Sequence, residues 1–222
     1  METITKIKSI QKITHDVFQI KAERPKNIEF TPGQATEISI NKDGWQTEKR
    51  PFTFTSLPDD NYLEFTIKSY PDHNGVTNEI AKLKAGDELL LHDVFGDIHY
   101  KGEGIFMAGG AGITPFISIF RYLDSTNQLG KNKLIFANKR KADIIMEHEF
   151  KRMLTENFIN VLSDEKAQGY EHGFITEDLL KKHSPLIAKH YYICGPPPMM
   201  DAVEKILHAL KVPEGTIVKE GF

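Results

Sequence analysis

A glycine-rich run in the middle of the chain has the composition of a phosphate-binding turn. Gly109, Gly110 and Gly112 stand between the apolar stretch that ends at Ala108 and the pair Thr114-Pro115. Glycine lets the backbone turn tightly and approach a bulky ligand, and a following helix offers N–H groups and partial positive charge to a pyrophosphate. The Thr114 hydroxyl is expected to cap a helix beginning at Pro115. The run predicts a nucleotide loop, with a ligand-free turn as the alternative.

A second loop of this kind, Cys194-Gly195-Pro196, follows a later apolar stretch. If the five expected strands of the second half are ordered 3-2-1-4-5, the first and fourth are neighbours and their two loops face one crevice. Cys194 could then meet a flat ring, although a lone cysteine is more often an inert core thiol. With one cysteine in the chain, an intrachain disulfide and a thiolate-bound iron-sulfur cluster are excluded.

The first half carries a different chemical group, Arg50-Pro51-Phe52-Thr53. The planar fork of an arginine suits a phosphate, an aromatic ring can cover an isoalloxazine face, and a threonine hydroxyl or amide can bond the ring edge. Downstream, Gly75-Val76-Thr77 opens the one helix expected in this half and is a second anion site. The plainer alternative is an ordinary strand with a surface arginine.

The elements that must position these groups change character near Tyr100 to Glu103. Before that point, short alternating stretches separated by turn residues predict a small antiparallel β-barrel, with one helix over Thr77–Leu83. After it, apolar runs alternate with helical stretches, which is typical of a five-stranded parallel sheet in an α/β domain. We therefore predict a first domain over residues 1–101 and a second over residues 102–222. The expected strands are Ile13–Ile20, Ala35–Ile40, Pro51–Leu57 and Leu63–Tyr70, then Gly104–Ala108, Lys133–Ala137, Phe158–Leu162, Tyr191–Cys194 and Thr216–Val218.

Composition narrows the class of protein. The 222 residues are 40% hydrophobic, and 28 basic against 31 acidic residues give a net charge of −3, so disorder is excluded and no broad basic face exists for a nucleic acid. No apolar stretch approaches the roughly 18 residues of a membrane span, and the amino terminus lacks the apolar region of a signal peptide. We expect a cytoplasmic protein without a membrane partner.

Four motifs in this order resemble the ferredoxin-NADP reductase family over nearly the whole chain. Arg50-Pro51-Phe52-Thr53 is similar to the family's flavin motif, and Gly75-Val76-Thr77 to its phosphate motif. Gly110-x-Gly112-x-x-Pro115 resembles its nicotinamide loop, and Cys194-Gly195-Pro196 its catalytic cysteine loop. The resemblance implies a flavin-binding barrel followed by a nicotinamide-binding domain.

The resemblance also implies residue roles. Arg50 would bind the flavin phosphate, Phe52 would stack on the ring, and Thr53 would approach flavin N5. The terminal Glu220-Gly221-Phe222 resembles the Glu-x-Tyr end of plant-type members, so Phe222 would cover the flavin and Glu220 would sit beside Cys194; a frayed end and a solvated glutamate are the alternatives. Thr53, Cys194 and Glu220 are the expected catalytic residues. The expected cofactor-binding residues are Arg50, Pro51, Phe52, Thr53, Gly75, Val76, Thr77 and Phe222 for flavin, and Gly110, Ala111, Gly112, Ile113, Thr114, Cys194, Gly195 and Pro196 for the nicotinamide cofactor.

Two departures bear on the choice of cofactor. Phe52 replaces the family's tyrosine, which keeps the stacking surface but loses the phenol. His92-Asp93-Val94-Phe95-Gly96 stands where many relatives carry Gly-Pro-x-Gly, which leaves both FAD and FMN open. The site at Gly75–Thr77 implies a second phosphate and favours FAD. Lys139 and Arg140 follow the second expected strand of the sheet, where a 2′-phosphate would favour NADPH over NADH; a solvated charge run is the alternative.

These observations lead to one expected function. No histidine lies in a zinc motif and no serine lies in a hydrolase elbow, so no metal site is expected. We expect a flavoprotein oxidoreductase that passes hydride between NAD(P)H and bound FAD and electrons onward to an external carrier such as ferredoxin or flavodoxin. One alternative is a reductase of free flavin, and another is a flavin-binding redox sensor without turnover. Oligomeric state is left open.

Overall fold

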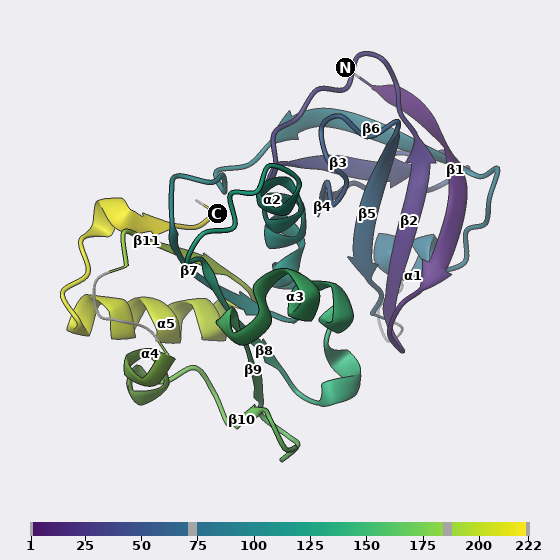
Figure 1. Cartoon of the computed structure of the whole chain (residues 1–222). Helices are drawn as coiled ribbons and strands as arrows, with labels where there is room; N and C mark the ends of the chain where they lie inside the picture. Colours follow the sequence, from purple (N-terminus) through teal and green to yellow (C-terminus); the bar gives the residue numbers. More distant parts are fainter. Residues whose placement is uncertain (1, 71–74, 184–187, 221–222) are drawn as a thin grey trace.

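The chain folds into two β-sheets that meet along one helix (Figure 1). The computed structural model describes residues 2–70, 75–183 and 188–220. The first sheet has the order β4-β3-β6-β1-β2-β5, and every neighbouring pair is antiparallel. An antiparallel bridge between Phe54 and Phe65 brings the end of the first edge strand to the other edge, so the sheet curls towards a barrel. Its strands are β1 (Thr3–Lys12), β2 (Val17–Glu23), β3 (Ala35–Ile40), β4 (Arg50–Thr53), β5 (Tyr62–Lys68) and β6 (Glu88–Phe95).

The barrel differs in detail from the expected elements. The expected strand Ile13–Ile20 is wrong in its first half, because the Ile13 and Thr14 amides bond the Val17 carbonyl and the chain turns there after β1. Its second half, Val17–Ile20, belongs to β2. The expected helix over Thr77–Leu83 is a five-residue helix, α1 (Val76–Ile80). Alternating buried positions such as Ile20, Ala22, Leu63 and Phe65 fill the interior, as the period of a strand requires. The antiparallel barrel architecture predicted from the sequence is confirmed.

The second sheet is parallel and has the order β10-β9-β8-β7-β11-β12. Five of its strands are the predicted ones, and they have the order 3-2-1-4-5 on which the expected shared crevice depended. The two-residue strand β10 adds a sixth at the edge, so the expected count of five is one short. The strands are β7 (Gly104–Gly109), β8 (Lys133–Asn138), β9 (Phe158–Leu162), β10 (Glu171–His172), β11 (His190–Cys194) and β12 (Ile217–Val218). The helices are α2 (Thr114–Ser125), α3 (Glu147–Leu154), α4 (Glu177–His183) and α5 (Pro197–Ala209).

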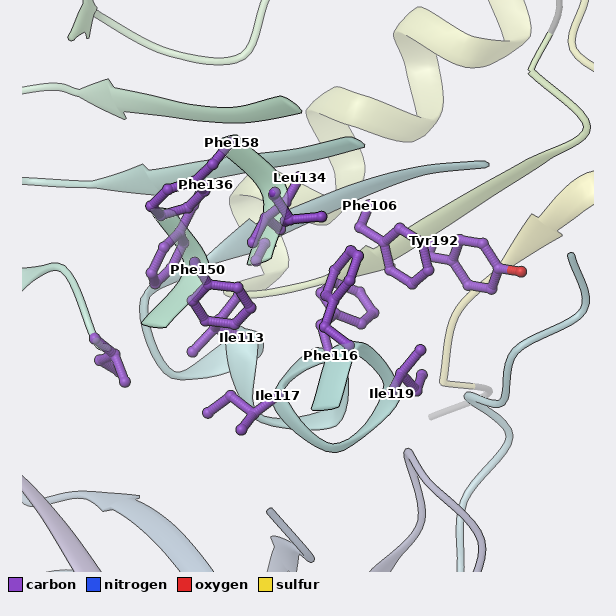
Figure 2. Packing of buried hydrophobic residues seen from close by; sticks show 14 of the residues in the cluster. Phe106, Ile113, Phe116, Ile117, Ile119, Leu134, Phe136, Phe150, Phe158 and Tyr192 are labelled. Carbon is purple, nitrogen blue, oxygen red and sulfur yellow. The ribbon is translucent and has the colours of Figure 1, made fainter. Parts of the chain in front are cut away.

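Helices cover both faces of this sheet, which explains its continuous apolar strands. Side chains of α2 and α3 pack on the face that includes Phe106 and Phe136, and side chains of α4 and α5 pack on the face that includes Met107 and Ile135. In Figure 2, Phe106 lies between α2 and Tyr192; its ring stacks on Tyr192 at 4.0 Å and meets Phe116 edge-on at 5.1 Å. These contacts hold α2 on this face of the central strands.

The two domains share apolar packing as well as a linker. Val17 of the barrel and Ile98 of the linker belong to the same buried cluster as Phe116 and Phe120 of α2. The Tyr192 hydroxyl accepts a hydrogen bond from the Lys101 amide at 2.9 Å and donates to the Gly102 carbonyl at 2.7 Å. The linker between β6 and β7 is thereby tied to the second sheet. The predicted division after residue 101 falls in this linker and stays a prediction.

Candidate active site

The two glycine loops of the second domain touch backbone to backbone. Strands β7 and β11 are paired neighbours, with Ala108 opposite Cys194, so the loops that follow them emerge side by side. A Cβ placed on Gly112 would lie 2.3 Å from the Cys194 carbonyl oxygen and 2.6 Å from the Gly195 Cα. Only glycine allows this approach. The carboxyl ends of the strands therefore present one composite edge at the topological switch point, where open parallel sheets bind ligands.

The helix that follows the first loop begins differently from the prediction. Residues Gly110–Ile113 form a 3₁₀ turn that runs directly into α2 at Thr114. The helix has no side-chain cap, and the Thr114 hydroxyl donates instead to the Ala111 carbonyl at 3.0 Å. The predicted threonine cap is wrong, because the chain is already helical where the cap residue would have to be extended. Pro115 does occupy the first turn, as predicted.

One cavity of about 280 Å³ collects residues from both domains. The barrel contributes the predicted flavin strand together with side chains of β5, and the second domain contributes the amino end of α2. The lining residues are Arg50, Pro51, Phe52, Thr53, Thr66, Ile67, Lys68, Tyr70, Thr77, Ala111 and Thr114. Two cations, two aromatic rings and several hydroxyls thus face a common space. Such a donor set fits a phosphate-bearing heterocycle.

The closest polar contact across the cavity joins the two predicted sites. The Thr114 hydroxyl lies 3.3 Å from the Thr53 hydroxyl. Thr53 is the last residue of β4, and Thr114 opens α2. The residue expected at the flavin edge and the residue expected at the nicotinamide loop are therefore within hydrogen-bond reach of each other.

Arg50 is held loosely in comparison. Its guanidinium donates to the carbonyl of the adjacent Lys49 at 2.6 Å and lies 4.0 Å from Glu48, and 51% of its side chain is exposed. Phe52 packs partly against the barrel core. Val76 is buried in the same core, so at Gly75–Thr77 only the Thr77 side chain borders the cavity.

Cys194 and Glu220 lie close enough to influence each other. Burial raises the pKa of the Cys194 thiol to about 12, and the negative charge of Glu220 adds to the effect. Glu220 accepts a hydrogen bond from the Asp97 amide at 3.1 Å, which ties the carboxyl-terminal segment to the linker after β6. The thiol is protonated at neutral pH, so Cys194 is suited to contact and positioning and is not a thiolate nucleophile. The predicted stacking residue Phe222 and its neighbour Gly221 lie outside the described residues.

The remaining predicted residues lie at the carboxyl end of β8. Lys139 and Arg140 directly follow β8 and are exposed. Asn138, the last residue of that strand, has a buried side-chain amide nitrogen without a hydrogen-bond partner. An unused buried donor at the carboxyl edge of a parallel sheet fits a nucleotide ligand, because buried polar groups are normally paired.

Sequence reasoning missed several cavity and interface residues. Thr66, Lys68 and Tyr70 line the cavity from β5 and its end, where alternation alone indicated only a strand. Ser118 and Arg121 of α2 bond the barrel, and a polar residue inside an apolar helical run was the only signal of this. Across the described parts of the chain, no cluster of three or more potential metal ligands occurs.

Comparison with known proteins agrees with this architecture. A family model described as a FAD-binding domain matches residues 2–100, and one described as an oxidoreductase NAD-binding domain matches residues 106–205. The chain is 30% identical to NADH-cytochrome b5 reductase 1 of Neosartorya fischeri, over 89% of this chain and 71% of that protein. It is 29% identical to the reductase component of propane 2-monooxygenase of Mycolicibacterium goodii, over 98% of this chain and 67% of that protein.

Solved structures extend the likeness to the whole fold. A ferredoxin NADP⁺ reductase from Neisseria gonorrhoeae with bound FAD and NADP has a TM-score of 0.86 at 21% identity, covering 100% of this chain and 99% of that one. The cytochrome b5 reductase domain of Ulva prolifera nitrate reductase has a TM-score of 0.84 at 20% identity, covering 99% and 97%. Some relatives are longer: the chain covers only 62% of NADH-cytochrome b5 reductase 2 of Mycosarcoma maydis, at 31% identity.

Fold, site and family models together define an oxidoreductase with one FAD-binding and one NAD-binding domain. The chain belongs to the ferredoxin-NADP reductase-like family. The predicted use of FAD with a nicotinamide dinucleotide is confirmed at this level. Within the described ranges, no helix combines the length and apolar content needed to cross a bilayer.

Proposed function

We propose that this chain is an NAD(P)H-dependent flavoprotein reductase that passes electrons to an external one-electron protein carrier. The observation that carries the proposal is the shared cavity, in which Arg50–Thr53 of the barrel face Ala111 and Thr114 of the second domain. Relatives include the reductase component of an oxygenase and cytochrome b5 reductases, whose names fit transfer to a second redox protein. A ferredoxin or a flavodoxin is the acceptor that the sequence favours.

Each group in the cavity has a role that follows from its chemistry. Arg50 and Lys68 supply cationic donors for the flavin phosphates, because arginine and lysine form charge-assisted bonds to such anions. Phe52 would cover one face of the ring, and the Thr53 hydroxyl would bond its edge. Gly110–Thr114 and Cys194–Pro196 form the floor for the nicotinamide ring, and the neutral Cys194 thiol and Glu220 orient it.

Bound flavin supplies the redox chemistry, since it accepts two electrons from a reduced nicotinamide and can release them singly. The protein supplies proximity, because holding reacting groups at contact distance removes roughly 7–11 kcal/mol of barrier. The 3.3 Å approach of Thr53 and Thr114 brings the residue proposed for the flavin edge next to the proposed nicotinamide loop. The backbone contact of Gly112 with Cys194 keeps that edge free of intervening side chains.

The choice of nicotinamide cofactor rests on the edge after β8. Lys139 and Arg140 are exposed there and could receive a 2′-phosphate. Acidic groups lie at the same edge, since the Lys141 amide donates to Glu165 at 2.9 Å and the Asp164 amide donates to the Lys139 carbonyl at 2.9 Å. With both signs of charge present, we propose a modest preference for NADPH.

The test is rapid mixing of the purified, desalted protein with each nicotinamide. A protein that keeps about one flavin per chain and bleaches on mixing supports the proposal. A colourless protein that oxidises nicotinamide only with added flavin would identify a reductase of free flavin. A yellow protein that neither nicotinamide bleaches would identify a redox-sensing module and contradict the proposed turnover. A panel of ferredoxin, flavodoxin and cytochrome b5 would then identify the class of acceptor.

A further inference from the structure

One stripe of α2 carries three polar contacts to the barrel. Thr114, Ser118 and Arg121 are spaced by four and then three residues, so they share one face of the helix. Thr114 meets Thr53 at 3.3 Å, and the buried Ser118 hydroxyl accepts a hydrogen bond from the Gly33 amide at 3.0 Å. The side of the helix that faces the sheet, by contrast, is apolar. The stripe is therefore a polar seam between the two domains.

Arg121 makes the largest set of bonds in this seam. Its Nη1 donates to the Thr55 carbonyl at 2.7 Å and to Glu64 Oε1 at 2.5 Å, both in the barrel. Its Nε and Nη2 donate to the two carboxylate oxygens of Glu149 on α3 at 2.6 and 2.9 Å. Glu64 is only 2% exposed. One guanidinium thus joins β5, α2 and α3.

The charges around Arg121 favour its ionised form. Burial by itself lowers the pKa of Arg121, but the hydrogen bonds to Glu149 and the charges of Glu64 and Glu149 outweigh burial and raise it. The junction is therefore a permanent set of directional, charge-assisted bonds. Apolar contacts such as those of Val17 with α2 are not directional, so they allow small sliding movements that the guanidinium fork does not.

The junction is connected to the cavity wall. The Thr55 hydroxyl donates to Glu64 at 3.0 Å and lies 3.3 Å from the Thr66 hydroxyl, and Thr66 lines the shared cavity. At the other end, Arg121 lies two helical turns from Thr114. A rotation of α2 about this junction would move Thr114 relative to Thr53.

We propose that Arg121 is a positioning residue that fixes α2 against the barrel and so sets the approach of the nicotinamide loop to the flavin edge. This inference rests on the proposed function for its kinetic consequence, but its structural part does not. Buried ion pairs are often no more stabilising than apolar side chains of similar volume, so a purely structural role is the competing explanation. The two explanations differ in the rate of flavin reduction that they predict for an Arg121 variant that is still folded and flavin-loaded.

The experiment compares Arg121→Met and Arg121→Lys with the wild type in the FAD-loaded protein. We expect reduction at saturating nicotinamide to slow by about 10- to 100-fold in Arg121→Met, because misplacement by about 1 Å can have effects of that size. Arg121→Lys keeps the charge, but its single nitrogen cannot reproduce the four N–H···O bonds that the planar guanidinium makes, so it should be intermediate. Glu64→Gln removes the negative charge from the same interdomain pair and should add little to Arg121→Met in the double variant.

Arg152→Met is the matched control, because Arg152 bonds Asp124 at 2.9 Å within the second domain. It should react at the wild-type rate. A wild-type reduction rate in a folded, flavin-loaded Arg121→Met would overturn the proposal. A rate that falls only in proportion to lost flavin would also overturn it, in favour of the purely structural role. If Arg121→Met does not fold, a wild-type rate in Arg121→Lys would overturn it equally.

Amide hydrogen exchange gives a readout that does not depend on activity. The Gly33 amide is protected by Ser118 across the domain interface, so it should exchange about tenfold faster in Arg121→Met, while amides paired between β2 and β5 keep their protection. Unchanged Gly33 exchange would contradict the positioning role. If the wild type shows no reduction by either nicotinamide, the proposed function fails, and the exchange result still decides whether Arg121 holds the domains together.

Discussion

The nicotinamide loops and the flavin strand differ in what holds them in place. Around Gly112, the site is made by main chain packed on main chain. A Cβ added to Gly112 would lie only 2.3 Å from the Cys194 carbonyl oxygen. Around Arg50, the site is made by side chains on a short strand, where the guanidinium contacts its sequence neighbours Lys49 and Glu48 and the side chain is half exposed. Substitutions in the first region should act through sterics and geometry. Substitutions in the second should act through ligand affinity.

Gly112→Ala is the most severe way to break this contrast. The new Cβ would meet backbone atoms of Cys194 and Gly195, which no rotamer change can move. We expect a loss of about 1–3 kcal/mol in the free energy of unfolding, typical of overpacking, measured in urea. Flavin reduction by nicotinamide should slow by at least about 100-fold, because the paired loops separate. Flavin content should be unchanged.

Gly215→Ala is the control for this prediction, because a Cβ there has open space around it. It should match the wild type in both measurements. If Gly112→Ala also reacted at the wild-type rate, the close contact between the loops would have no catalytic meaning.

Arg50→Ala should give the opposite pattern. Removing a charge-assisted phosphate contact should weaken flavin binding by about 1.5–3 kcal/mol, measured as the dissociation constant in a fluorescence titration of the flavin-free protein. The unfolding free energy of the flavin-free protein should hardly change, because the side chain is half exposed. Arg152→Ala removes the same charge from the other domain and should leave flavin affinity unchanged. Equal losses in both variants would indicate a general charge effect and contradict a specific phosphate contact.

The same contrast separates what the sequence could and could not predict. Strands β7, β8, β9, β11 and β12 lie within one residue of their predicted bounds, because a parallel sheet covered on both faces requires continuous apolar runs. Strands β1 and β6 of the barrel were not singled out. In β1, the apolar Ile4 is exposed and the polar Thr5 is buried, so the alternation of residue types gives a weak signal there.

The site residues likewise divide into those that the sequence could predict and those that it could not. Glycines such as Gly112 and Gly195 could be predicted to approach each other, because strand order alone brings their loops together. The bonds of Ser118 and Arg121 could not be predicted, because they depend on how one domain sits on the other. The cap at Thr114 was wrong for a local reason, since a 3₁₀ turn precedes the helix.

A smaller effect is expected from Cys194, whose buried thiol should make the free energy of unfolding depend on pH at alkaline pH. Burial raises its pKa to about 12 in the folded protein, above the ordinary value of 9.0, so the folded state retains the proton that the unfolded state loses. This contribution to stability is therefore fully present below pH 9 and is lost as pH rises from 9 towards 12. Between pH 7 and 10, the wild type should lose about 1 kcal/mol that Cys194→Ala does not lose, measured by urea unfolding of both. Parallel pH profiles would mean that the thiol is solvated and would remove its role in the packed loop.

The smallest expected effect concerns the edge after β8. The double variant Lys139→Ala and Arg140→Ala should lower the ratio of kcat/KM for NADPH to that for NADH by about fivefold or less, because exposed charge interactions contribute at most about 1 kcal/mol. Glu165→Gln should shift the ratio the other way, since it removes a negative charge beside Lys141. Raised salt should reduce both shifts, because exposed charges are screened. If neither variant changes the ratio, other residues set the cofactor preference. The exposed charges after β8 would then not bind the cofactor as the exposed Arg50 is proposed to bind the flavin.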